Sequence, residues 1–270
     1  MYMNSQNVSE AQRQFLNGLD RQKKHIRLCQ ISILVFFILI WEFAAQFEII
    51  DPFIFSQPSR IALAAVELTK SGSIFVHIGV TLFETIIGFV LGTIIGIAVA
   101  VLLWWNSFIN KVLEPYLVVR NSLPKTALAP IMIVWLGNNM SSIIATALLT
   151  SVIVTILSVF NGFIEVDSDK IKLIYTFGGT KKQVLTKVIL PASVPNMISA
   201  LKINVGLSFV GVIVGELLVS KAGLGYLIVY GSQIFKLDWV MLSVVILAVL
   251  SALLYKSIVV LEKKISKWRE

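Results

Sequence analysis

Six stretches of this sequence are apolar over the length that a helix needs to cross a membrane. A helix spans the hydrocarbon core with about 20 predominantly apolar residues, and ISILVFFILIWEFAAQFEII, from Ile31, is the first stretch of this kind. The chain is 57% hydrophobic and 14% charged, whereas a soluble domain is about a quarter charged. The apolar excess must face something other than water, so the sequence predicts an all-α polytopic membrane protein.

The apolar stretches define one transmembrane domain over residues 31–262, between an N-terminal segment, 1–30, and a tail, 263–270. Its predicted spans are about 31–50, 76–105, 108–137, 141–160, 194–219 and 239–260. The third of these contains Pro124 and Pro130. Because proline removes a backbone donor, we expect this span to be kinked or broken and to pack against protein rather than lipid.

Basic residues lie in three blocks beside the apolar runs, and the net charge of the chain is +8. The blocks fall within residues 1–30, within 161–192 and after Tyr255. Lysine and arginine are enriched on the cytoplasmic side of membrane proteins. Six spans place the three blocks and both termini on that side, whereas five spans would separate them. Because the basic residues form no single patch, their pattern favours membrane topology over nucleic-acid binding.

The residues that usually carry chemistry are sparse and scattered. The single cysteine, Cys29, excludes an internal disulfide, and His25 and His77 do not form a cluster at metal-ligand spacing. A membrane-embedded enzyme would need clustered His, Asp or Cys near one interface. The sequence therefore predicts no catalytic residue and no metal or cofactor bound by this chain.

Glycines recur every fourth residue in two of the predicted spans. They are Gly88, Gly92 and Gly96 in the second span, and Gly211 and Gly215 in the fifth. This spacing lets helix backbones approach closely in lipid. It serves either packing within the chain or a dimer seam, and we favour packing within the chain.

The segment 165–192 is too polar to cross a membrane and divides into two short predicted helices. Asp167 or Ser168 is a suitable N-cap for the first. Gly178 stands where a left-handed residue ends a helix, and Thr180 is suited to cap the second helix. The segment therefore predicts a helix, a glycine elbow and a second helix.

The second of these helices is amphipathic. One face holds Val184, Leu185, Val188 and Ile189, and the other holds Lys181, Lys182 and Lys187. We expect Pro191 to end this helix, and Pro195 to lie in the first turn of the fifth span, where proline is tolerated.

Three interpretations of the elbow compete. A helix pair lying flat on anionic lipid is one. A phosphate-binding loop is disfavoured, because no later glycine–lysine–serine or threonine follows Gly178. A docking element for a cytoplasmic protein is favoured, because a sharp turn projects away from the membrane plane.

The spacing around the elbow resembles that of a known family. Gly178, nine residues, Val188, one residue, Leu190 and Pro191 resemble the EAA loop of ABC-importer permeases. Four further segments resemble the nitrate, sulfonate, taurine and thiamine-precursor pyrimidine subfamily: WEFAAQFEIIDPFIFSQPSRI, GFVLGTIIGIAVAVLL, RNSLPKTALAPIMIVWLG and VGVIVGELLVSKAGLGYLI. The resemblance covers nearly the whole chain.

This resemblance implies the type I ABC-importer permease fold and a transport function without enzymatic activity. It implies a second permease copy, a cytoplasmic ATPase dimer that holds ATP and magnesium, and an external substrate-binding protein. The setting would be a bacterial cell membrane with both termini of the chain in the cytoplasm. The solute would be a small anion such as a sulfonate, nitrate or taurine; the alternative is a thiamine-precursor pyrimidine. The ATPase-docking loop would comprise Thr176, Phe177, Gly178, Gly179, Thr180, Lys181, Lys182, Gln183, Val184, Leu185, Val188, Leu190 and Pro191.

The sequence departs from the family pattern at two places. Lys172, Leu173 and Ile174 stand where the family has Glu-Ala-Ala, which reverses a charge beside the elbow. Glu84 stands where we expect a basic residue.

Two groups of polar residues are candidates for the translocation path. They are Arg120, Asn121, Ser122, Pro124 and Lys125, around the break in the third span, and Glu216 in the fifth span. A polar, unwound stretch within the membrane can line a path or bind an anion. The alternatives are a helix cap near the cytoplasmic interface for the first group and an interfacial structural role for Glu216.

Two classes outside ABC importers remain as alternatives. A secondary carrier would need intramembrane charge pairs, which are not evident in the sequence. A structural membrane protein would leave the elbow without a purpose.

Overall fold

The computed structural model describes residues 10–266, which are helical and contain no strand. The helices are α1 (Glu10–Gln46), α2 (Pro52–Phe55), α3 (Pro58–Lys70), α4 (Ser73–Trp105), α5 (Ser107–Ser122), η1 (Lys125–Leu128), α6 (Ala129–Leu136), α7 (Met140–Ile164), α8 (Ser168–Thr176), α9 (Lys181–Val184), η2 (Leu185–Ile189), α10 (Leu190–Val219), α11 (Leu224–Gln233) and α12 (Leu237–Ser266). They divide into two compact units, Met1–Leu63 and Ala64–Glu270. The ends of the predicted terminal segments, 1–9 and 267–270, lie outside the described residues.

The first unit consists largely of α1, which begins well before the predicted first span. Its apolar window is only 6% buried, so within this unit its side chains are free to face lipid or another protein. After it, Asp51 caps the single turn of α2 by accepting a hydrogen bond from Phe53 N at 2.8 Å. Glu42 Oε2 accepts a hydrogen bond from Ser59 N at 2.9 Å and thereby ties α1 to the start of α3.

The core of the second unit is α7, which packs against both α4 and α10. The glycine ladders face α7: a Cβ atom at Gly92 would lie 2.5 Å from Ser151 Oγ, and one at Gly211 would lie 2.5 Å from Ala147 Cα. Both distances are far below van der Waals contact. The favoured prediction of packing within the chain is therefore confirmed. At these contacts α7 contributes small residues, Ser151 opposite Gly92 and Ala147 opposite Gly211.

The predicted third span is broken into α5, η1 and α6. Pro124 disfavours a helical conformation at the residue before it, and Leu123 is extended, with φ −69° and ψ 140°. Five helices of the described residues are long and apolar enough to span a membrane, one fewer than predicted. The expected packing against protein is met by part of α6, which contacts α7 and buries Ala129 and Met132, whereas Val134 and Trp135 are 81% and 74% exposed in the single chain.

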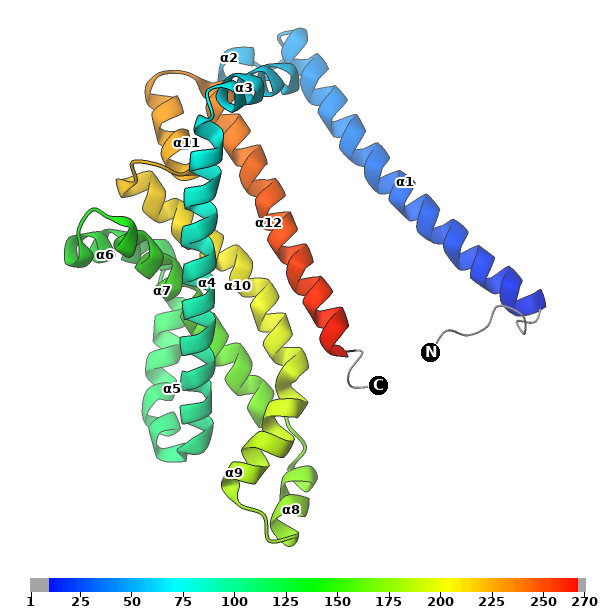
Figure 1. Cartoon of the computed structure of the whole chain (residues 1–270), viewed down its shortest axis with the longest axis vertical. Helices are drawn as coiled ribbons and strands as arrows, with labels where there is room; N and C mark the ends of the chain where they lie inside the picture. Colours follow the sequence, from blue (N-terminus) through cyan, green and yellow to red (C-terminus); the bar gives the residue numbers. More distant parts are fainter. Residues whose placement is uncertain (1–9, 267–270) are drawn as a thin grey trace. The chain divides into compact units, whose positions relative to one another are not determined.

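The broken segment nevertheless carries the chain from one end of the second unit to the other. Figure 1 shows α4 and α7 running from the end with α6 and α11 towards the end with α8 and α9. Because α4 and α7 run in the same direction, the segment between them must bring the chain back to the end where α4 begins. The α5–η1–α6 segment supplies that return without forming one continuous helix.

The fifth span begins earlier than predicted. Residues Lys181–Val219 form one helical run in which η2 is a π-helical turn, Leu185–Ile189. Pro191 lies in the first turn of α10 and Pro195 inside it, so the expectation that Pro191 ends the preceding helix is wrong. In a regular α-helix the proline ring would clash with the carbonyl of the preceding turn, and a wider π-turn moves that carbonyl.

Candidate functional site

The elbow lies at the end of the second unit where α7 ends and α10 begins (Figure 1). Asp167 caps α8, with its Oδ1 accepting from Asp169 N at 2.9 Å. Gly178 N then donates to Tyr175 O at 2.9 Å, and Gly179 N donates to Ile174 O at 2.8 Å. This pair of bonds is the Schellman motif that ends a helix at a left-handed residue.

The two glycines of the elbow are required for different reasons. Gly178 has φ +76° and open space around it, so a side chain there is strained by conformation alone. At Gly179 a Cβ atom would lie 2.4 Å from Ile174 Cγ2 and 2.7 Å from Ile174 O. The predicted glycine corner is therefore confirmed at both positions.

The second arm of the elbow is fixed by a capping box and a lysine anchor. Thr180 and Gln183 cap each other reciprocally at the start of α9. Lys181 Nζ donates to Trp105 O, the end of α4, at 2.6 Å and lies 5.6 Å from the centre of the Trp104 ring. The ammonium group thus satisfies a terminal helix carbonyl and stabilises the negative end of the helix dipole. Sequence reasoning missed this role, because it assigned Lys181 only to the polar face.

The predicted docking residues divide into an exposed tip and a buried base. Thr176, Phe177, Gly178, Thr180, Lys181, Lys182 and Gln183 are exposed, and Gly179, Val188 and Leu190 are partly buried. Val184 and Leu185 are 0% and 8% exposed and pack in a cluster with Val159 and Phe163 of α7. These two residues, which we expected to insert into a partner, instead hold the elbow against the membrane helices.

The departure from the family pattern in α8 has a local explanation. Lys172 Nζ lies 3.0 Å from Asp169 Oδ1, and both side chains are largely exposed. Ile174 packs against the buried cluster of α7 and α9, while Leu173 is 55% exposed. The charge that replaces the family's glutamate is thus partly balanced within α8.

At the other end of the second unit, Glu216 is 1% exposed and holds the turn between α10 and α11. Thr81 Oγ1 donates to Glu216 Oε1 at 2.7 Å and accepts from Leu224 N at 2.8 Å. Gly225 N donates to Glu216 Oε2 at 2.6 Å, and Gly223 N donates to the His77 ring at 3.1 Å. Three of the N–H groups at the start of α11, those of Gly223, Leu224 and Gly225, are thereby satisfied from α4 and α10. We call this the Glu216 cluster.

The glycines of the Glu216 cluster leave room for the carboxyl group. A Cβ atom at Gly223 would lie 2.3 Å from Glu216 Oε1, and one at Gly225 would lie 2.7 Å from Glu216 Cβ. Sequence reasoning missed Thr81, His77 and both glycines as members of this site. The available signal was GLG placed a few residues after an intramembrane glutamate.

Glu84 lies beside Glu216, is also 1% exposed, and shares a side-chain hydrogen bond with it. Two buried carboxylates placed side by side would repel each other strongly. Glu84 Oε2 is buried and has no hydrogen-bond partner among residues 10–266. The residue Glu84 lines a pocket of 250 Å³ formed by α4, the start of α7 and the loop after α10.

The predicted path residues do not form one site in this chain. Glu216 is buried in its cluster, whereas Asn121 and Pro124 are exposed at the break between α5 and η1, and Lys125 is partly buried. The side chains of Arg120 and Ser122 lie outside the described residues. A path lined by residues 120–125 stays a prediction.

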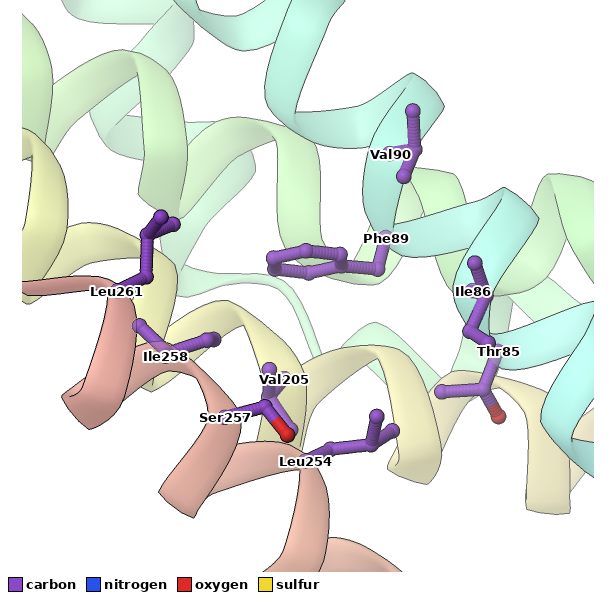
Figure 2. Close-up of a pocket in the computed structure, with 9 residues that line it drawn as sticks. All are labelled: Thr85, Ile86, Phe89, Val90, Val205, Leu254, Ser257, Ile258 and Leu261. Atoms are coloured by element: carbon purple, nitrogen blue, oxygen red, sulfur yellow. The ribbon is translucent and has the colours of Figure 1, made fainter.

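A second pocket, of 320 Å³, is apolar and lies between α4, α10 and α12. Figure 2 shows Phe89 and Ile86 of α4 facing Leu254, Ile258 and Leu261 of α12 across it. Its lining contributes hydroxyl groups only from Thr85 and Ser257. This pocket offers little that could orient a polar solute, in contrast to the pocket at Glu84.

Two pairs of ionisable side chains join the long apolar helices of the second unit. Besides Glu84 and Glu216, Lys202 Nζ of α10 lies 2.7 Å from Glu262 Oε2 of α12. Pairs of ionisable side chains therefore do occur between these helices, and their apparent absence from the sequence is no argument against a secondary carrier. The choice between the classes depends on the family comparisons.

Residues 88–269 match the family described as the binding-protein-dependent transport system inner membrane component, and the chain belongs to this family. The helical architecture is that of a type I ABC-importer permease. The chain is accordingly the membrane permease subunit of an ABC importer and not a catalytic enzyme.

Named relatives cover most of the chain. It is 31% identical over 233 residues to the formylaminopyrimidine transport permease ThiX of Halalkalibacterium halodurans, covering 86% of this chain and 92% of that protein. It is 28% identical over 232 residues to a protein named as an aliphatic sulfonates transport permease, SsuC of Bacillus subtilis, covering 86% and 84%. Among solved structures, the MetNI methionine ABC transporter matches with a TM-score of 0.61 and 20% identity, covering 68% of this chain and 92% of that chain. The last likeness concerns the fold alone.

Proposed function

We propose that this permease works in an ATP-driven importer with a second permease copy, two cytoplasmic ATPase subunits and an external substrate-binding protein. The ATPase subunits would hold ATP and magnesium. The elbow and both termini would lie in the cytoplasm of a bacterial cell, and the elbow would dock in a groove of the ATPase. The observation that carries this proposal is the exposed tip on a rigid base: Phe177 is 80% exposed, whereas Val184 behind it is fully buried.

The elbow is built to transmit movement. It continues into Lys181–Val219, one helical run of 39 residues that ends at the Glu216 cluster. Lys181 also ties the elbow to the end of α4. A displacement of the tip would therefore move α4 and α10 together and would reach the opposite end of the membrane domain. This lever gives ATPase closure a mechanical route to the translocation path.

The solute that we propose is small and polar. The two named relatives are permeases for formylaminopyrimidine and aliphatic sulfonates, and we extend that chemical range to this chain. An anionic sulfonate, nitrate or taurine is the first proposal, and a thiamine-precursor pyrimidine is the second.

Substitution Gly178→Asp tests the docking elbow. A side chain at φ +76° is strained, by about 1–2 kcal/mol, and the new carboxylate would stand on the proposed docking tip. We expect the variant to insert and assemble but to lose most ATP-driven uptake in proteoliposomes, with ATP hydrolysis uncoupled from transport.

Gly72→Asp is the matched control, because Gly72 has φ +74°, has no atom within 4 Å of an added Cβ, and lies at the start of α4, away from the elbow. It should keep its uptake. Normal uptake by Gly178→Asp would overturn the docking role of the elbow.

A further inference from the structure

Glu84 Oε2 is buried and accepts no hydrogen bond from the described residues. Leaving a buried polar atom unsatisfied costs about 1–3 kcal/mol, and the surrounding helices present no donor to Glu84 Oε2 among the described residues. The atom belongs to a side chain that is 1% exposed and lines a pocket of 250 Å³. A single water needs only about 10–15 Å³ of such a volume, so the pocket has room for a small solute.

The lining of this pocket contains one acidic and one basic side chain, Glu84 and Lys221. Glu84 contributes a buried carboxyl oxygen without a hydrogen-bond partner among the described residues, and Lys221 contributes an exposed ammonium group. Asn139 is engaged in capping α7, since its Oδ1 accepts from Ser141 N at 2.9 Å and its Nδ2 donates one hydrogen bond to Leu136 O at 2.8 Å. The groups available to a ligand therefore include an acidic acceptor at Glu84, the Lys221 cation and the exposed amide of Asn138.

The pocket lies at the end of the helices opposite the elbow. Its lining comes from Val80 and Glu84 of α4, Met140 and Ile143 of α7, and Val219 at the end of α10. With the elbow in the cytoplasm, this end faces outward, where a binding protein would release its solute. This location is therefore suitable for a solute-binding site on the translocation path.

We propose that this pocket binds the transported solute through an amino group, which donates a hydrogen bond to Glu84 Oε2 while the anionic or acceptor end of the solute faces Lys221. This inference rests on the proposed importer function, which it narrows to amine-bearing solutes such as an aminosulfonate or an aminopyrimidine. A simple anion without an N–H donor would bring negative charge to an acidic pair and would leave Glu84 Oε2 unsatisfied.

Ligand binding to the full chain in lipid nanodiscs, without ATPase subunits, tests this site. The probes are taurine, formylaminopyrimidine, and ethanesulfonate as a sulfonate without the amine, each titrated by calorimetry up to millimolar concentrations. We expect taurine or formylaminopyrimidine to bind, and which of the two binds identifies the source of the amine. We expect ethanesulfonate to bind at least about tenfold more weakly than the amine that binds. Equal binding of taurine and ethanesulfonate, or no binding of either amine, would overturn the proposal.

Three variants locate the binding at Glu84. Glu84→Leu removes the acceptor and should weaken binding of the amine probe at least about tenfold. Glu84→Gln keeps an acceptor oxygen of the same reach and should bind more tightly than Glu84→Leu. Thr85→Val is the control, because Thr85 is equally buried on the next position of α4 but lines the apolar pocket, and it should bind as the unaltered chain does.

The variants also distinguish three outcomes: a misfolded protein, an incorrect proposal for the importer assembly, and an incorrect proposal for the binding site. Thermal unfolding of Glu84→Leu close to that of Thr85→Val would show that lost binding is not lost folding. If Glu84→Gln proves as weak as Glu84→Leu, or Glu84→Leu binds normally, the acceptor role is wrong. Because the assay contains no ATPase, amine binding without ATPase docking would reject the proposed assembly while leaving the Glu84 site intact.

Discussion

Glu216 is a costly residue for a membrane span, and its surroundings explain why it is tolerated. An ionisable side chain in a span is expensive unless it is paired. Here both carboxyl oxygens accept hydrogen bonds, from Thr81 and from Gly225, and Glu84 shares a further one. A single side chain therefore determines how the chain turns from α10 into α11.

Thr81 is the residue whose removal should weaken this arrangement most selectively. Substitution Thr81→Val deletes the donor to Glu216 and the acceptor for Leu224 N, so it should cost about 1–3 kcal/mol of stability. Thr85→Val is a matched control, since Thr85 is also 1% exposed but its hydroxyl has no partner among the described residues.

The measurement is the unfolding midpoint of both purified variants in the same detergent. Thr85→Val should be neutral or stabilising, because it removes a buried hydroxyl that makes no bond. If the two valine variants lower the midpoint equally, the Glu216 cluster does not contribute as described.

At the scale of elements, α7 is the helix around which the second unit is organised. Helices in lipid gain little from burying apolar surface and associate through close packing of small residues. The glycines of α4 and α10 and the small residues of α7 supply this packing from two sides. This contact, rather than α12, whose apolar window is only 6% buried, gives the membrane domain its rigid centre.

A compensating pair tests the fit between α4 and α7. Gly92→Ala places a methyl group 2.5 Å from Ser151 Oγ, and overpacking of this kind costs about 1–3 kcal/mol. Adding Ser151→Gly removes the obstructing side chain and should recover most of the lost unfolding midpoint. A double variant no more stable than Gly92→Ala would show that the two helices do not meet at this register.

The elements that could be predicted from sequence are those with local causes. The elbow follows from Asp167, Gly178 and Thr180, whose capping roles depend on near neighbours in the chain. The continuation of α9 into α10 could not be predicted, because Pro191 usually signals a helix end and the π-turn that accommodates it has no simple sequence signal. The Glu216 cluster joins residues about 135 positions apart, such as Thr81 and Glu216, so spacing alone could not reveal it.

At the scale of the whole molecule, the second unit has two ends with different chemistry. One end carries lysines and an exposed aromatic tip on a buried base. The other carries a buried pair of carboxyl groups, a polar pocket and the α10–α11 turn. The helical run Lys181–Val219 joins them. This arrangement is what an importer subunit needs if energy arrives at one end and solute at the other.

Site-specific photo-crosslinking tests whether the tip of the elbow contacts the ATPase. A photoreactive phenylalanine analogue replaces Phe177, which is 80% exposed at the elbow, or Phe235, which is 70% exposed between α11 and α12. In membranes containing the complete transporter, we expect a crosslink to the ATPase subunit from position 177 and none from position 235. Equal crosslinking from both positions, or labelling of lipid alone from position 177, would contradict it.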